Sequence, residues 1–255
     1  MNSLLLLLII PFITAACLLL AKKDSTIKGI ALAGSIVQFI TAIILTFSYV
    51  SMRHAGSVEA MLFQSSYEWF APLHIFFRIG VDGISLTMIL LTAMVVLAGI
   101  LVSWKITAQV KEFFFLIVFL SLGAYGFFMS TDLFIMFFFL ELAVIPKYLL
   151  IGIWGSGKKE YSAMKLALML MGGSALVFLG ILGIYLVSGM NGGTPSWDLH
   201  QIAALHIPIE YQRIIYILTF TGFGVFTALF PFHTWAPDGH SSAPTAASMF
   251  WLASR

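Results

Sequence analysis

Charged residues are scarce in this sequence. They make up 9% of its 255 residues, and hydrophobic residues make up 60%. A soluble domain carries about 25% charged residues. The mean hydropathy is +1.02. This composition excludes a water-soluble globular protein and indicates one that crosses a membrane several times. The formal net charge of +2 is too small to indicate a nucleic-acid partner.

Cysteine is almost absent as well. The one cysteine, Cys17, lies inside an apolar run. A single cysteine excludes an internal disulfide, and it excludes a zinc site or cluster ligated by cysteines of this chain alone. The stretch GIWGSGKK at 152–159 partly fits a phosphate-binding loop, but it lacks the final Ser/Thr and follows no strand. We therefore expect no metal site and no bound cofactor on the chain.

Long apolar runs dominate what is present. A bilayer-spanning helix takes about 20 residues, and seven runs reach that length, with an eighth beginning near Ala243. They cover residues 3–21, 27–50, 83–104, 113–130, 131–154, 162–188 and 212–230. The sequence predicts an all-α, polytopic membrane helix bundle. The seventh helix is expected to be broken by Pro231, Pro237 and Pro244, because proline lacks the backbone N–H that a helix uses.

The basic residues predict an orientation. With the N-terminus outside, only Arg53, Arg78 and Arg213 fall on the outer side. All loop lysines then fall on the cytoplasmic side, as the positive-inside rule requires. These are Lys22, Lys23, Lys28, Lys105, Lys111, Lys158 and Lys159.

Five ionisable residues are the candidate site. Glu141 and Lys147 lie in the fifth run, Lys165 lies in the sixth, and His233 and His240 follow the seventh. Ionisable groups at membrane depth usually mark an ion or proton pathway, and the alternative is a paired packing element. A Glu–Lys pair can act as a proton-loading switch, because moving one charge changes the protonation of the other. The histidines could shuttle protons, or they could satisfy carbonyls that the helix break frees.

Two aspartates stand at the starts of predicted helices. Asp82 begins the third run and Asp132 the fifth. An N-cap role, in which the carboxylate accepts from the first backbone N–H groups, is as good an interpretation as a functional one.

Three motifs carry a family resemblance. GVDGISL at 80–86, STDLF at 130–134 followed by FFFLELAVIPKYLLIGIWG, and FPFHTWAPDGHSSAPTAAS at 230–248 resemble the antiporter-like membrane subunits of respiratory complex I, the proton-pumping NADH:quinone oxidoreductase. The similarity is greatest to the chain 4 type and covers nearly all of the chain. Subunits of Mrp-type Na⁺/H⁺ antiporters share the glutamate and histidine motifs.

The resemblance assigns roles to residues. Glu141 matches the family's fifth-helix glutamate, which pairs with a lysine on the seventh helix, and Lys165 matches a lysine often found on the sixth. Alignment of GFGVFTALFPFH places Phe226 where that seventh-helix lysine usually stands, whereas Lys147 stands where relatives often have methionine. Our hypothesis is that the ammonium group has moved from helix seven to helix five and serves the same cavity.

The resemblance also implies a function. It implies a proton-translocating membrane subunit that couples electron transfer from NADH to quinone with proton pumping. NADH, FMN, iron–sulfur clusters and quinone would bind partner subunits, and adjacent antiporter-like subunits and the lipid of a bacterial inner membrane would surround this chain. Alternatives are a subunit of an Mrp-type antiporter and a non-functional fragment.

The resemblance implies a domain organisation too. Family members have about fourteen spans in two inverted repeats of five helices. We therefore expect residues 1–255 to form one truncated antiporter-like domain, with the first repeat at about 110–255 and the second absent.

Overall fold

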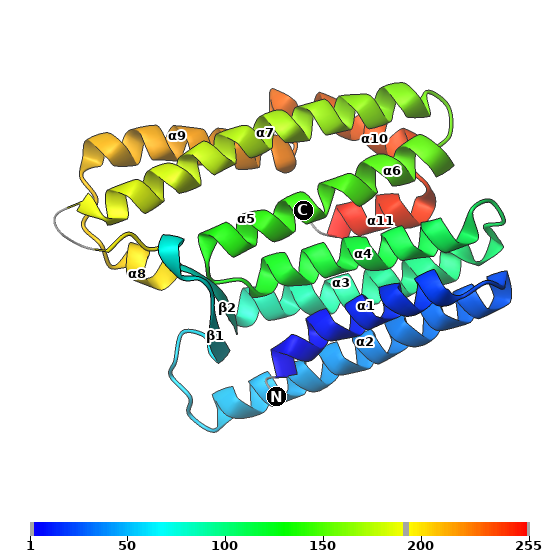
Figure 1. The fold of residues 1–255 in the computed structure, drawn as a ribbon, viewed down its shortest axis with the longest axis horizontal. Coiled ribbons are helices and arrows are strands. Elements are labelled where there is room, and N and C mark those ends of the chain that lie inside the picture. Colours follow the sequence, from blue (N-terminus) through cyan, green and yellow to red (C-terminus); the bar gives the residue numbers. More distant parts are fainter. Residues whose placement is uncertain (1–2, 191–193, 254–255) are drawn as a thin grey trace.

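The computed structural model describes residues 3–190 and 194–253, so residues 1–2, 191–193 and 254–255 of the expected domain lie outside the described residues. The described chain is a helical bundle with one short hairpin (Figure 1). Its elements are α1 (Ser3–Leu20), α2 (Asp24–His54), β1 (Leu62–Phe70), η1 (Ala71–Leu73), β2 (Ile75–Val81), α3 (Gly83–Val102), η2 (Ser103–Lys105), α4 (Val110–Met129), α5 (Leu133–Leu142), α6 (Val144–Trp154), α7 (Lys159–Ser188), α8 (Leu199–Ala203), α9 (Ile209–Phe226), η4 (Phe232–Thr234), α10 (Trp235–Ser242) and α11 (Thr245–Ala253).

The prediction of a membrane helix bundle is confirmed. Within the described residues, six helical segments are long and apolar enough to cross a membrane, namely α1, α2, α3 with η2, α4, α5 with α6, and α7. The predicted seventh span is α9, which packs along α7, and the start of the predicted eighth is α11. In Figure 1 the helices form successive layers from α1 and α2, through α3 and α4, to α5 and α6, and finally to α7 and α9.

Two prolines set the helix breaks. A proline cannot donate to the carbonyl four residues before it. For Pro146 that residue is Leu142, where α5 ends, and for Pro231 it is Thr227, the residue after α9. The fifth predicted span is therefore two helices joined at Ala143, and the seventh ends at Phe226 rather than at residue 230.

A third proline is compensated by another helix. Pro11 lies inside α1 and cannot donate to the carbonyl of Leu7. The side-chain amide of Gln38 in α2 donates to that carbonyl instead, at 2.9 Å. Gln38 is buried, with 3% of its surface exposed, so the contact joins α1 to α2 inside the bundle.

The hairpin β1–β2 is an element that the all-α prediction treats as a connection. The strands pair antiparallel, with Leu62 opposite Val81 and Ser66 opposite Arg78. Aromatic and β-branched residues favour strands, but an isolated two-stranded hairpin is marginal in water. This one is held by packing, because Leu62, Ile79 and Val81 are buried in the same cluster as residues of α1, α2, α3 and α4.

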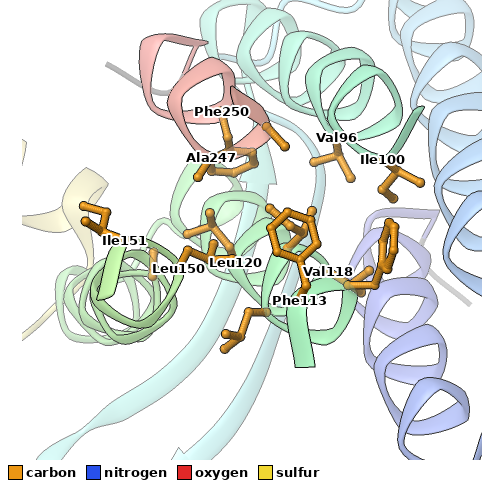
Figure 2. Packing of buried hydrophobic residues seen from close by; sticks show 14 of the residues in the cluster. Val96, Ile100, Phe113, Val118, Leu120, Leu150, Ile151, Ala247 and Phe250 are labelled. Carbon is orange, nitrogen blue, oxygen red and sulfur yellow. The ribbon is translucent and has the colours of Figure 1, made fainter. Parts of the chain in front are cut away.

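The last helix folds back into the bundle. Residues Ala247 and Phe250 of α11 pack between Val96 of α3, Leu120 of α4 and Leu150 of α6 (Figure 2). The turn between α10 and α11 therefore places α10 against α7 and α11 against α3. This arrangement brings the segment after α9 into contact with the helices that carry the candidate residues.

The two ends of the bundle differ in charge. The hairpin, α8 and the loop before α9 lie at one end, which we call the hairpin end (Figure 1). The connections α1–α2, η2–α4 and α6–α7 lie at the other, which we call the lysine end. There Lys28 Nζ donates to Trp104 O at 2.8 Å, and Lys111 Nζ donates to Leu19 O at 2.9 Å. All seven loop lysines belong to this end.

Candidate functional site

Glu141 lies at the break between α5 and α6. Its carboxylate Oε1 is 2.5 Å from the hydroxyl oxygen of Ser174 in α7. The same hydroxyl is 2.9 Å from the carbonyl of Leu170 in its own helix. A hydroxyl has one hydrogen, so Ser174 donates to one of these two oxygens at a time.

Lys147 lines a cavity beside this break. The cavity measures about 220 Å³. It is bounded by Phe139 and Ala143 near Glu141, and by Phe226 and Thr227 at the end of α9. The charge of Lys147 also acts electrostatically on the Glu141 carboxylate. Lys147 and Phe226, the two positions in our relocation hypothesis, therefore line one and the same cavity.

The break after α9 leaves carbonyl groups that need donors. The indole Nε1 of Trp235 donates to Val225 O at 2.9 Å, and the backbone N–H of Leu229 donates to Gly224 O at 2.7 Å. The hydroxyl of Thr227 donates to Phe223 O at 3.0 Å. The donors to these carbonyls are an indole, a backbone amide and a hydroxyl.

Lys165 has a different partner from Glu141. Its Nζ donates to Asp238 Oδ2 of α10 at 2.7 Å. Ser174 is nine positions further along α7, which corresponds to about 13 Å in a helix. Lys165 and the Glu141–Ser174 contact therefore lie at separate levels of the bundle.

The two histidines have different surroundings. His233 is exposed, and its ring stacks on that of Phe230 with 5.7 Å between the centroids. His240 is partly buried, and its Nδ1 is 3.0 Å from Ser248 Oγ, which joins α10 to α11. Among the residues that the structure describes, no group of three or more His, Cys, Asp and Glu side chains could hold a metal ion.

The N-cap interpretation of both aspartates is confirmed. Asp82 accepts from Ser85 N at 2.7 Å, and Asp132 accepts from Phe134 N at 3.0 Å and Ile135 N at 3.2 Å. Asp132 has a second role that the sequence does not reveal. Arg78 Nη1 of β2 lies 3.8 Å from Asp132 Oδ2 and 3.5 Å from Asp198 Oδ2, so one guanidinium ties the hairpin to the start of α5.

Burial dominates the electrostatics of Asp132. No part of its side chain is exposed, and this desolvation raises the pKa of the carboxyl from 3.8 to about 6. The N–H groups of Ile135 and Phe134 and the charge of Arg78 oppose the rise but do not cancel it.

Three residues that the sequence analysis does not propose for the site contact Glu141, the break after α9 and Lys165. They are Ser174, Trp235 and Asp238, respectively. Asp238 is an ionisable residue next to the helix break, which is a signal that the sequence offers. Trp235 follows the break but carries no charge. Ser174 is one small polar residue in an apolar helix, and nothing in its local sequence distinguishes it.

Comparison with known proteins covers most of the chain. Residues 130–254 match the family model described as NADH:quinone oxidoreductase/Mrp antiporter, transmembrane. The chain is 34% identical over 229 residues to the chloroplastic NAD(P)H-quinone oxidoreductase chain 4 of Angiopteris evecta, covering 89% of this chain and 44% of that protein. It is 29% identical over 245 residues to chain 4-1 of Synechocystis, covering 95% of this chain and 45% of that protein.

Over most of its length the chain is similar to antiporter-like membrane subunits of the chain 4 type. It spans less than half the length of these two curated relatives. The fold of the chain also matches solved structures, each under 25% identical. One is respiratory complex I from Thermus thermophilus with bound NADH, with a TM-score of 0.82, 22% identity, and coverage of 98% of this chain and 50% of that chain. Another is the archaeal membrane-bound sulfane sulfur reductase, with a TM-score of 0.80, 23% identity, and coverage of 97% and 49%.

Proposed function

We propose that this antiporter-like subunit translocates protons within an NADH:quinone oxidoreductase, driven by electron transfer on partner subunits. The observation that carries the proposal is the position of Glu141. Its carboxylate lies at a helix break inside a membrane bundle. It accepts a hydrogen bond from the Ser174 hydroxyl and interacts electrostatically with Lys147. Ionisable groups are rare at membrane depth and mark ion or proton routes.

The contact between Glu141 and Ser174 has the geometry of a proton switch. When Glu141 is ionised, its Oε1 accepts from the Ser174 hydroxyl. When Glu141 is protonated, it donates to the Ser174 oxygen, and the serine hydrogen turns to Leu170 O. Both states satisfy the same atoms with a single rotation of one hydroxyl, so loading and unloading the proton leaves no buried polar group unpaired.

Lys147 is the charge that sets this switch. An ammonium group close to a carboxylate favours its ionised form, and one further away favours protonation. The cavity of about 220 Å³ gives the lysine side chain room to move. The shared lining by Lys147 and Phe226 supports our hypothesis that the ammonium has moved from helix seven to helix five.

The other three predicted residues belong to the same route in this proposal. Lys165 relays between the lysine end and the Lys147 cavity. His240, on the same short helix as Asp238, and His233, at the break after α9, exchange protons with the route. No residue of this chain takes part in electron transfer. NADH, FMN, iron–sulfur clusters and quinone bind partner subunits, and adjacent antiporter-like subunits contact this one in the membrane.

The curated relatives favour this function over an Mrp-type antiporter, because the Angiopteris and Synechocystis proteins are named as NAD(P)H-quinone oxidoreductase chain 4. In this proposal the protein is a multi-pass protein of a bacterial inner membrane with its N-terminus outside.

The decisive experiment is Glu141→Gln in the assembled complex, reconstituted in proteoliposomes. Proton translocation is expected to fall by about 100-fold or more, the usual contribution of a positioned acid–base group. Dye-reported proton uptake is measured alongside quinone reduction by NADH. Glu112→Gln, at an exposed carboxylate in the first turn of α4, is the matched control and retains uptake. Normal proton uptake by the Glu141→Gln variant would contradict the proposal.

The hypothesis that the lysine has moved is tested by removing Lys147 and placing a lysine at position 226. Lys147→Met is expected to lose uptake, and Lys147→Met/Phe226→Lys is expected to regain part of it, because both positions line one cavity. If Lys147→Met alone pumps normally, Lys147 does not carry the proton. If the double variant is as inactive as the single one, the two positions are not equivalent.

A further inference from the structure

A second cavity opens at the lysine end of the bundle. It measures about 550 Å³ and lies between the α6–α7 loop, the first turn of α7, and α10. Apart from one glycine, every residue in its lining carries a polar or charged side chain, in contrast to the largely apolar cavity around Lys147. The lining residues are Ser156, Gly157, Lys158, Tyr161, Ser162, Asp238, Ser241 and Ser242.

The Lys165–Asp238 ion pair forms a wall of this cavity. Asp238 lines it directly, and Lys165 Nζ donates to Asp238 Oδ2 at 2.7 Å. The side chains are 24% and 41% exposed, so neither charge is fully buried. Beside the pair, the hydroxyl oxygens of Ser162 and Ser242 are 2.8 Å apart and join α7 to α10.

The short helix α10 lines both this cavity and that of Lys147. Trp235 is the first residue of α10 and lines the Lys147 cavity. Asp238 comes three positions later and lines the polar cavity. Residues three apart lie on the same face of a helix. One face of α10 therefore meets the apolar cavity at Trp235 and the polar cavity at Asp238.

We propose that the polar cavity is a water-filled vestibule for hydronium, and that the Lys165–Asp238 pair is the gate between it and the Lys147 cavity. The inference deepens the proposed function and rests on it. A hydronium ion gives a proton to Asp238 Oδ2: one O–H bond of H₃O⁺ breaks, the Asp238 O–H bond forms, and a water molecule remains. Neutral Asp238 no longer holds the Lys165 ammonium, which swings aside and opens the route past Trp235.

The gate is tested by measuring how fast a thiol reagent reaches the Lys147 cavity, rather than by measuring proton pumping. Ala124 is buried and lines the Lys147 cavity. Ala124→Cys is placed in a Cys17→Ser background of the assembled complex, a small charged thiol probe, 2-aminoethyl methanethiosulfonate, is added from the lysine end, and labelling of this subunit alone is followed by mass spectrometry. Labelling is expected to be slow, and Asp238→Asn is expected to speed it about tenfold or more. Glu160→Gln, at an exposed carboxylate in the first turn of α7, is the control and leaves the rate unchanged.

An unchanged labelling rate at position 124 in the Asp238→Asn variant would contradict the proposal that the Lys165–Asp238 pair is a gate. If that variant fails to assemble, Lys165→Met breaks the same pair from the other side and is judged by the same rate. The exchange Lys165→Asp/Asp238→Lys rebuilds the pair and is expected to return labelling to the slow rate, whereas continued fast labelling counts against the proposal. Labelling is measured without turnover and with Glu141 unaltered. A loss of the proposed function in the Glu141→Gln experiment is thus distinguishable from a failure of the gate.

Discussion

At the scale of single residues, Asp132 combines a helix cap with an ion pair in a fully buried place. Its Oδ1 accepts from the first N–H groups of α5, and its Oδ2 faces Arg78 of the hairpin. The carboxyl holds its proton to about pH 6 because burial outweighs these contacts. Its protonation is therefore coupled to the attachment of the hairpin.

This coupling has a definite sign. The pKa of Asp132 is raised from 3.8 to about 6 on folding. The group's contribution to stability is fully present below pH 3.8 and is lost as the pH rises through 6. The difference corresponds to a loss of on the order of 3 kcal/mol. Asp132→Asn keeps the cap but cannot ionise, so the variant should lose this part of the pH dependence.

The measurement is the thermal unfolding midpoint in detergent from pH 4.5 to 7.5, taken as the difference between the variant and the unaltered protein. Asp132→Asn should gain relative stability toward the upper end of this range. A difference that stays constant with pH would show that the buried carboxyl does not titrate there.

The sequence predicted the role of a single residue wherever that role depends only on the residue type and its neighbours in the chain. Pro231 predicted the break after α9, and Pro244 predicted the one between α10 and α11. The prediction of a break at Pro237 is wrong, because Pro237 lies in the first turn of α10, where no helical partner needs its missing N–H. The aspartates at helix starts were anticipated as caps. Ser174 and the Arg78 contacts could not be predicted, because each joins elements that are far apart in the chain. The roles of Glu141, Lys147, Lys165, His233 and His240 remain predictions.

At the scale of elements, α7 and α9 pack so closely that only glycine fits at some positions. A Cβ added at Gly222 would lie 2.7 Å from Val177 N and 2.8 Å from Gly173 O. A Cβ added at Gly173 would lie 2.9 Å from Val225 Cβ. Small residues let helix backbones approach within a membrane, where packing rather than the hydrophobic effect holds helices together.

Gly222→Ala is therefore expected to destabilise the protein by about 1–3 kcal/mol, because backbone atoms must move apart. Gly172→Ala is the matched control. It adds the same methyl group to α7 where no heavy atom lies within 4 Å, and it should be neutral or slightly stabilising. Thermal unfolding midpoints of the two variants decide the matter, and equal midpoints would contradict the close packing.

Among elements, the helices could be predicted because apolar run length determines them. The hairpin β1–β2 could not, since its residues form strands only where the bundle supplies a surface. The fifth span was predicted as one helix over 131–154, and the structure divides it at Ala143, because Pro146 cannot donate to the carbonyl of Leu142.

At the scale of the whole molecule, the loop lysines share one end while Arg53, Arg78 and Arg213 lie toward the other. This asymmetry predicts which end faces the cytoplasm. In a Cys17→Ser background, Ser66→Cys on exposed β1 should react with an impermeant thiol reagent only from outside the cell. Ser156→Cys, in the α6–α7 loop, should react only from the cytoplasmic side. Reaction with the opposite sidedness would invert the proposed orientation.

The amide of Gln38 on the Leu7 carbonyl has a consequence for how the chain enters the membrane. Helix α1 leaves the ribosome before α2 exists, and its Pro11 leaves that carbonyl without a donor. An unsatisfied carbonyl in lipid costs several kcal/mol. We expect α1 to remain at the insertion machinery until α2 has been synthesised. The two helices would then enter the bilayer together as a packed pair.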